Sequence, residues 1–205
     1  MDEMTNIVIA GAGSAGIATS LFLCKEKIPH VIIEKSKFPR DKICGDALSG
    51  KIPDVLKKLD AGFSIEKNAE GLEAIGSYGV KFVAPNGNFV DVPFANDLQK
   101  LNHAPGYVSK RIHFDDFLFR KIDHTIATVL EEADVIELKQ ENGFNEVRYM
   151  KNKTEHSIRC RLIVGAEGDR SLVAKKLAGY QKEDEHYCAG IRAYYKGVKN
   201  FHSQE

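Results

Sequence analysis

The stretch Ile7-Val-Ile-Ala-Gly11-Ala-Gly13-Ser-Ala-Gly16 places an apolar run directly before a GxGxxG glycine pattern. The apolar run predicts a buried strand, and the glycines predict a tight turn into a helix over residues 14–27. Gly11 permits the turn, Gly13 lets the backbone approach a pyrophosphate, and Gly16 lets the helix pack closely on the sheet. The start of that helix favours bound phosphate, because its N–H groups and dipole attract negative charge.

A second apolar run, Val31-Ile32-Ile33, ends in Glu34, 23 residues after Gly11. An acid at about this distance accepts hydrogen bonds from adenosine ribose hydroxyls and disfavours a 2′-phosphate. Strand, glycine turn, helix, strand and acid follow in that order, so the sequence predicts a dinucleotide site that does not hold NADP. A glycine turn in an unrelated α/β protein is the alternative interpretation.

The overall composition is that of an ordinary globular protein. The 205 residues are 43% hydrophobic, and 29 Lys and Arg balance 29 Asp and Glu to a net charge of zero. Zero net charge gives no support for nucleic-acid binding. No apolar run reaches membrane-spanning length and no signal pattern precedes the first strand, so we expect a cytoplasmic location, with peripheral membrane contact left open. The four cysteines and seven histidines lack metal-ligand spacing, so we predict no metal site.

The remaining pattern mixes helices with antiparallel strands. Pro85-Asn86-Gly87-Asn88 between two apolar runs predicts a hairpin over residues 80–92. Apolar periodicity predicts helices over residues 52–59, 112–130 and 173–177. Strands are expected over residues 134–139, 146–151, 157–161, 162–164 and 189–195, with 162–164 buried and 146–151 paired to 157–161.

Four segments together resemble the geranylgeranyl reductase branch of the para-hydroxybenzoate-hydroxylase-like flavoproteins. They are Gly11–Gly16 with Glu34, Phe38-Pro-Arg-Asp-Lys-Ile-Cys44-Gly45 through Gly50, Ser109–Asp115 with Leu118, and Gly165-Ala-Glu-Gly168-Asp-Arg-Ser171. Their order covers nearly the whole chain, and the PRxKxCG stretch separates this branch from ordinary aromatic hydroxylases.

The resemblance implies an α/β fold, a three-layer FAD-binding Rossmann-like domain with an inserted, incomplete antiparallel substrate sheet. Residues 1–70 and 106–186 would form the FAD-binding domain. Residues 71–105 and 187–205 would contribute to the substrate-binding sheet.

The resemblance also implies roles for individual residues. Gly11, Gly13, Ala15 and Gly16 would hold the FAD pyrophosphate, and Glu34 the adenosine ribose. Arg40, Cys44, Gly45 and Ala47 would line the loop beside the ribityl chain and isoalloxazine. Arg111 would reach the ribityl and phosphate region, Val135 would meet the adenine through its backbone, and Gly165 to Gly168 would support the pyrophosphate.

Ordinary structural roles remain the alternative for several of these positions. Cys44 could be only a loop residue, and Arg40 and Arg111 could be surface charges. Asp115 is expected to support the start of its helix. No catalytic residue is named by the sequence.

Three departures from the family pattern stand out. Asp46 replaces the second glycine of Cys-Gly-Gly and would add a carboxylate near the flavin. Glu167 replaces the usual Asp of the second glycine motif. Family members are also longer and carry a later Gly-Asp motif for the ribityl chain. We therefore expect this chain to be the N-terminal part of a flavoprotein, with weak or absent FAD, no turnover and self-association through unpaired strand edges.

The resemblance implies an FAD-dependent oxidoreductase that reduces carbon–carbon double bonds of a polyprenyl-type small-molecule or lipid substrate, with NAD(P)H as a candidate electron donor. An FAD-dependent monooxygenase acting on an aromatic or lipid substrate is a second candidate. A non-catalytic nucleotide-binding fragment is a third.

Overall fold

The computed structural model describes residues 3–59, 72–97, 100–101 and 103–199. The chain divides into two compact units, residues 1–40 with 115–189 and residues 41–114 with 190–205. The functional boundaries expected from the sequence, at residues 70, 105 and 186, stay a prediction. Among the described residues, no helix is long and apolar enough to cross a bilayer. In the same part of the chain, no three His, Cys, Asp or Glu side chains gather as metal ligands would.

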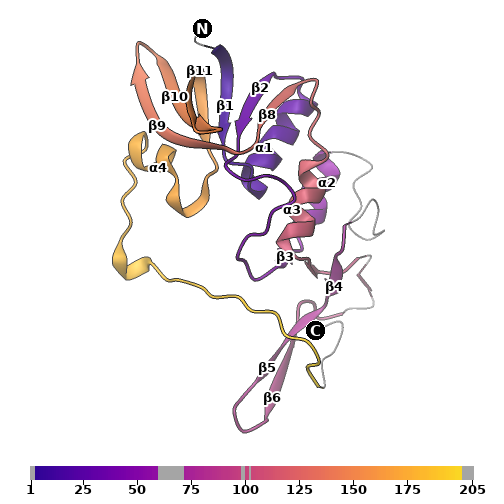
Figure 1. The fold of residues 1–205 in the computed structure, drawn as a ribbon. Helices are drawn as coiled ribbons and strands as arrows, with labels where there is room; N and C mark the ends of the chain where they lie inside the picture. The colour runs from indigo at the N-terminus through magenta and orange to yellow at the C-terminus, as the bar shows by residue number, and fades with distance from the viewer. Residues whose placement is uncertain (1–2, 60–71, 98–99, 102, 200–205) are drawn as a thin grey trace. The chain divides into compact units, whose positions relative to one another are not determined.

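The first unit is built on a six-stranded mixed sheet with the order β8-β2-β1-β11-β10-β9 (Figure 1). Its strands are β1 (Glu3–Ala10), β2 (His30–Ile33), β8 (Ala127–Leu130), β9 (Ala133–Glu141), β10 (Phe144–Lys151) and β11 (Thr154–Gly165). The first four strands in that order are parallel, and β10 and β9 continue the sheet antiparallel. Helix α1 (Ser14–Lys25) packs against β1 and β2.

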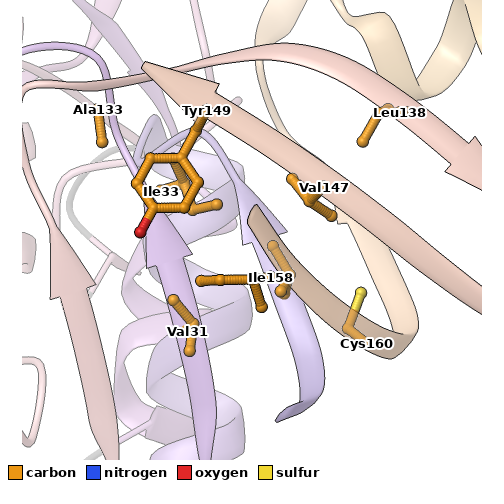
Figure 2. Packing of buried hydrophobic residues seen from close by; sticks show 9 residues of the cluster. Val31, Ile33, Ala133, Leu138, Val147, Tyr149, Ile158 and Cys160 are labelled. Atoms are coloured by element: carbon orange, nitrogen blue, oxygen red, sulfur yellow. The ribbon is translucent and has the colours of Figure 1, made fainter. Parts of the chain in front are cut away.

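The core of this unit is an apolar cluster formed by β1 and β2 with β9, β10 and β11 (Figure 2). Strand β2 is buried along its whole length, as expected for a β-branched run with neighbours on both edges. Val8, Val147 and Ile158 are fully buried in the cluster. This packing fixes the carboxyl ends of β1 and β2, where the glycine turn and Glu34 follow.

The helix predicted over residues 112–130 is shorter than expected. Helix α3 (Arg111–Phe119) ends well before Leu130, and residues 127–130 form β8. The segment Thr125-Ile-Ala-Thr-Val-Leu130 is rich in β-branched residues, which favour a pleated strand. Its register beside β2, with His30 opposite Ala127, supplies the backbone partners that a helix would have provided locally.

The second unit contains a small antiparallel sheet and a separate two-stranded ribbon. The sheet has the order β3-β7-β4, from β3 (Ala47–Ser49), β7 (Gly106–Val108) and β4 (Ile75–Ser77). The ribbon pairs β5 (Gly79–Val83) with β6 (Phe89–Pro93), so the predicted hairpin is confirmed, and Gly87 at its tip has a φ of 85°. Helix α2 (Ile52–Leu59) also forms as predicted.

Two strand predictions need correction. Residues 189–195 form no strand, because no described segment offers the backbone partners that a strand requires. Residues 162–164 are the end of the long β11 and not a separate strand, and Leu162 is 54% exposed. Helix α4 (Leu172–Lys176) follows β11 after the short 3-10 helix Gly168–Arg170, and a second 3-10 turn lies at Asp184–His186.

Candidate functional site

Two glycine turns of the first unit meet backbone to backbone at the end of β1. Gly11 has a φ of 91°, and a Cβ there would lie 2.6 Å from the carbonyl oxygen of Ala166. A Cβ at Gly16 would overlap the carbonyl oxygen of Gly11. The Ala166 N–H donates to the Ala10 carbonyl at 2.8 Å, which ties the turn after β11 to the turn after β1. Side chains at Gly11 or Gly16 would therefore separate the two turns.

Helix α1 begins directly at this junction with its first turn open. Gly13 is the N-cap residue, and no side chain caps the helix. Ser14 and Ala15 are exposed, and the Ile17 N–H donates to the Gly13 carbonyl at 2.9 Å. A 12-residue helix with an uncapped, exposed start can bind an anionic group through its N–H groups and dipole.

Glu34 lies beside the same turn and is only 4% exposed. Its Oε2 accepts from the Ala12 N–H at 2.6 Å, and its Oε1 accepts from the Ser36 N–H at 3.0 Å. Its carbonyl accepts from the Ala133 N–H at 2.9 Å, which brings the start of β9 next to it. A carboxylate can accept about four hydrogen bonds, so Glu34 keeps capacity for a further donor.

Arg40 approaches the glycine loop from the other side. Its Nη2 donates to the Ala12 carbonyl at 3.0 Å, and its Nη1 lies 3.5 Å from Asp115 Oδ2. Its Nε lies 3.4 Å from Glu34 Oε1, within ion-pair distance, yet lacks a hydrogen-bonding partner among the described residues. A buried donor without an acceptor is uncommon, and a bound acceptor such as a phosphate oxygen would satisfy it.

Aromatic packing holds Arg40 in this position. Phe38 stacks on Phe119 with ring centroids 3.9 Å apart, and Arg40 lies 4.9 Å from the Phe38 ring. The Phe38 N–H donates to Glu131 Oε1 at 2.6 Å. Asp115 on α3 is fully buried and pairs with Arg40. The sequence had predicted only that Asp115 supports the start of its helix, and not this ion pair.

Glu167 in the second glycine turn is bound to its own neighbours. Its Oε2 accepts from the Ser171 hydroxyl at 2.5 Å, and its Oε1 accepts from the Leu172 N–H at 2.9 Å. Ser171 in turn caps α4 by accepting from the Ala174 N–H at 3.1 Å. The longer acid therefore binds the start of α4. Gly168, just after it, has a φ of 76°.

Two further residues predicted to contact FAD, Val135 and Gly165, lie in different parts of the first unit. Val135 lies on β9 opposite Tyr149, two residues after the Ala133 that bonds to Glu34. A Cβ at Gly165 would lie 2.7 Å from Val173 Cβ, so this glycine makes room for α4.

Four predicted site residues, Cys44, Gly45, Ala47 and Arg111, belong to the second unit. The pKa of Cys44 is lowered, first by a hydrogen bond from the Asp46 backbone N–H and further by the neighbouring Arg111 guanidinium. Arg111 is mostly buried, and its N–H donates to Asp46 Oδ1 at 3.3 Å. A Cβ at Gly45 would meet no atom within 4 Å, so this glycine borders open space.

The structure thus gathers one set of predicted residues around the glycine turns of the first unit. This set is Gly11, Gly13, Ala15, Gly16, Glu34, Arg40, Gly165 and Gly168. Of the second unit's residues, Cys44 and Gly45 lie in the loop after Arg40, Ala47 begins β3 and Arg111 begins α3. Sequence reasoning did not identify the Ala12 backbone, which bonds to both Glu34 and Arg40. No side-chain pattern could reveal it, because the contacts use main-chain atoms.

Several characterised proteins are similar in sequence. Conditioned medium factor receptor 1 of Dictyostelium discoideum is 28% identical over 208 residues, covering 98% of this chain and 40% of that protein. The 1H-pyrrole-2-carbonyl-[peptidyl-carrier protein] brominase of Pseudoalteromonas luteoviolacea is 28% identical, covering 95% and 45%. Digeranylgeranylglycerophospholipid reductase of Methanococcus vannielii is 28% identical, covering 91% and 43%. The chain spans about two fifths of the length of these relatives.

Solved structures share the fold. A flavoprotein/dehydrogenase from Cytophaga hutchinsonii superposes with a TM-score of 0.66 at 25% identity, covering 81% of this chain and 40% of that one. A flavin-dependent monooxygenase in complex with FAD and substrate superposes with a TM-score of 0.71 at 16% identity, covering 86% and 32%. The mixed sheet and glycine turns are therefore those of FAD-binding Rossmann-like proteins. The FAD binding domain family matches residues 4–193, almost the full length, and the chain belongs to this family.

Proposed function

We propose that the protein is an FAD-dependent oxidoreductase that reduces carbon–carbon double bonds of a polyprenyl-type substrate. The observation that carries the FAD assignment is the glycine junction with Glu34 on one side and Arg40 on the other. The buried Arg40 Nε without an acceptor and the uncapped start of α1 fit a pyrophosphate. Glu34 fits the adenosine ribose and disfavours NADP in this loop.

The remaining first-unit residues would complete the nucleotide site. Ala15 lies exposed in the first turn of α1, where the pyrophosphate would bind. Val135 would contact the adenine through its backbone, near Glu34. Gly165 and Gly168 would support the pyrophosphate from the second turn, because both lie in the turn that packs against Gly11.

The second unit would contribute the residues around the flavin ring. Cys44, Gly45 and Ala47 would line the ribityl chain and isoalloxazine, and Arg111 would bind the ribityl or phosphate region. Bound FAD would supply hydride transfer between a nicotinamide donor and the substrate. The chain's own residues would orient the cofactor and exclude water, and none of them is assigned as an acid or base.

An apolar cavity in the second unit supports an apolar substrate. It has a volume of about 940 Å³ and lies beside β3, β5 and β7. Leu48, Val80, Phe94 and Tyr107 contribute apolar surface, and Lys81 adds a cationic group. Ligand cavities of this size are typically lined by apolar side chains with a few polar ones. An isoprenoid chain, which is apolar and long, would suit such a lining.

The relatives support two reaction types. The reductase from Methanococcus vannielii favours double-bond reduction, while the brominase and the monooxygenase structure favour oxygen-dependent chemistry.

Product analysis with and without oxygen separates the two. Reduction of a polyprenyl substrate by the full-length protein in anaerobic buffer with NAD(P)H would support the proposal. A product that forms only with oxygen would favour the monooxygenase alternative.

The FAD site is tested by titrating the full-length protein with FAD and following flavin fluorescence, because the 205-residue chain alone is expected to bind FAD weakly. Glu34→Ala should weaken binding by about 1–3 kcal/mol, or roughly 5- to 150-fold, because hydrogen bonds to a charged acceptor are lost. Glu34→Gln keeps the side-chain size and separates ligand loss from collapse of the loop. Glu141→Ala, an exposed change on β9, is the matched control. Equal affinity in the Glu34 variants and the parent would refute the ribose role.

A further inference from the structure

The segment after Gly190 is fastened to the loop that follows Arg40. Arg192 Nη1 donates to the Lys42 carbonyl at 2.9 Å, and Arg192 Nη2 donates to Asp41 Oδ2. The Tyr194 hydroxyl donates to Asp46 Oδ2 at 2.6 Å. All of these residues belong to the second unit. We call Asp41, Asp46, Arg192 and Tyr194 the latch.

Asp46 is the residue on which the latch converges. Its φ is 61°, in the left-handed region that glycine adopts freely and a side chain disfavours. Its carbonyl accepts from the Ser109 N–H at 2.9 Å, and its Oδ1 accepts from the Arg111 N–H and lies 3.6 Å from Arg192 Nη1. Asp46 is 6% exposed, and with Tyr194 on its other oxygen its carboxylate is bound on both sides.

Cationic side chains lie beside the acidic and aromatic groups of the latch. Arg192 lies over the Tyr194 ring, with its guanidinium 4.6 Å from the centroid, and Lys110 lies 5.2 Å from the same ring. Arg192 and Arg111 lower the pKa of Asp41, with the Arg192 hydrogen bond as the largest cause. The Asp46 carboxylate, which the sequence predicted to lie near the flavin, is thus held by Arg192 and the Tyr194 hydroxyl.

We propose that Arg192 and Tyr194 are positioning residues that fix residues 41–47 in the conformation in which this loop meets the flavin. The two side chains bind opposite ends of the loop, Asp41 and Asp46, with Cys44 and Gly45 between these anchors. Contacts at both ends of the loop restrict how far Cys44 can move while both are intact. The loop's role toward the flavin rests on the function proposed above, and the latch itself does not.

Cys44 reports the loop geometry without FAD. Its pKa is lowered first by the Asp46 N–H and then by Arg111, and both depend on the loop conformation. Opening the latch should move the pKa of Cys44 upward, so its alkylation by iodoacetamide should require higher pH. Mass spectrometry of the Cys44 peptide gives the rate at each pH, separately from the other three cysteines.

Tyr194→Phe is the decisive variant, because it removes one hydrogen bond and leaves the charge unchanged at neutral pH. It should shift the alkylation midpoint of Cys44 upward and make FAD binding weaker, and Arg192→Ala should do the same. Arg192→Lys keeps a positive charge, so it should raise the alkylation midpoint less than Arg192→Ala does. Tyr195→Phe and Lys196→Ala, both exposed neighbours, should leave the midpoint unchanged.

The outcomes separate the latch from the flavin assignment. An unchanged alkylation midpoint of Cys44 in Tyr194→Phe and Arg192→Ala overturns the positioning role of the latch, as does an equal shift in the two controls. An upward shift in Tyr194→Phe and Arg192→Ala alone supports the positioning role. Protection of Cys44 by saturating FAD in the full-length protein tests the flavin assignment alone. Lack of protection there, together with a shifted midpoint in Tyr194→Phe, retains the latch and removes its role toward the flavin.

Discussion

Gly16 shows how strictly a single position can be constrained in this fold. Any side chain there would overlap the Gly11 carbonyl, and backbone atoms cannot yield as a flexible side chain can. We expect Gly16→Ala to lower the melting temperature strongly or to prevent folding. Gly45→Ala is the control, because a Cβ there meets nothing within 4 Å. Circular dichroism melts of both variants make the comparison, and similar stability in the two would contradict it.

Cys160 should give a distinct pH dependence of stability. It is fully buried on β11, and burial raises its pKa from 9.0 to about 11. The folded state therefore holds the proton more tightly than the unfolded chain. The resulting stabilisation is fully present below pH 9 and is lost as pH rises from about 9 to 11, at about 1.4 kcal/mol per pH unit.

The measurement is urea unfolding at a series of alkaline pH values. Cys160→Ala should lose stability less steeply over this window than the parent protein. Cys188→Ala removes an exposed thiol and should follow the parent curve. Parallel curves for Cys160→Ala and the parent would show that the buried thiol does not contribute.

At the scale of elements, α4 depends on Glu167 for its start. Removing this side chain would leave the Leu172 N–H and the Ser171 hydroxyl without their acceptor. Glu167→Ala should therefore lower the free energy of unfolding by about 0.5–2 kcal/mol, the usual cost of a lost helix cap. Chemical denaturation measures it, with the exposed Glu185→Ala as the control. A difference within error between the two variants would refute the capping role.

Local sequence signals predicted the elements whose determinants are local. The glycine turn after β1, the Asn86-Gly87 hairpin and the pairing of β10 with β11 all follow from adjacent residues. The prediction of a helix over residues 112–130 was wrong at its C-terminal end. The apolar periodicity continues to Leu130, but residues 127–130 pair with β2 as a parallel strand. The prediction of a strand over residues 189–195 was wrong because a segment with strand propensity forms no strand unless a neighbouring strand supplies its hydrogen bonds.

The candidate site divides along the same line. Gly11, Gly16 and Glu34 could be named from spacing, because the glycine turn and the proposed ribose contact impose fixed separations. The Arg40–Asp115 pair and the latch join residues 75 and about 150 positions apart in the chain. Contacts of that separation are set by the folded topology, which a single sequence does not specify residue by residue.

At the scale of the whole molecule, the β5–β6 ribbon carries the most exposed apolar sheet surface in the second unit. The cross-strand pairs Val80–Val92 and Phe82–Val90 lie on one face, and Phe82 and Val90 are each 62% exposed. The opposite face carries the Lys81–Asp91 ion pair at 3.5 Å and the exposed pair Val83–Phe89. A two-stranded ribbon with open edges and exposed apolar side chains is a surface on which a second copy can pair, and the face with two apolar pairs and no ion pair is the one we assign to the contact.

We therefore expect this chain to self-associate through the ribbon, with the faces that carry Val80–Val92 and Phe82–Val90 in two copies buried against each other. Phe82→Thr with Val90→Thr keeps residues that favour strands but removes apolar area, so it should weaken association. Ile136→Thr makes a comparable change on the exposed side of β9 and serves as the control. Sedimentation velocity over a concentration series gives the dissociation constants. The ribbon is the contact only if the double variant weakens association and Ile136→Thr does not. A monomeric parent protein at all concentrations, or equal weakening by both changes, would exclude it.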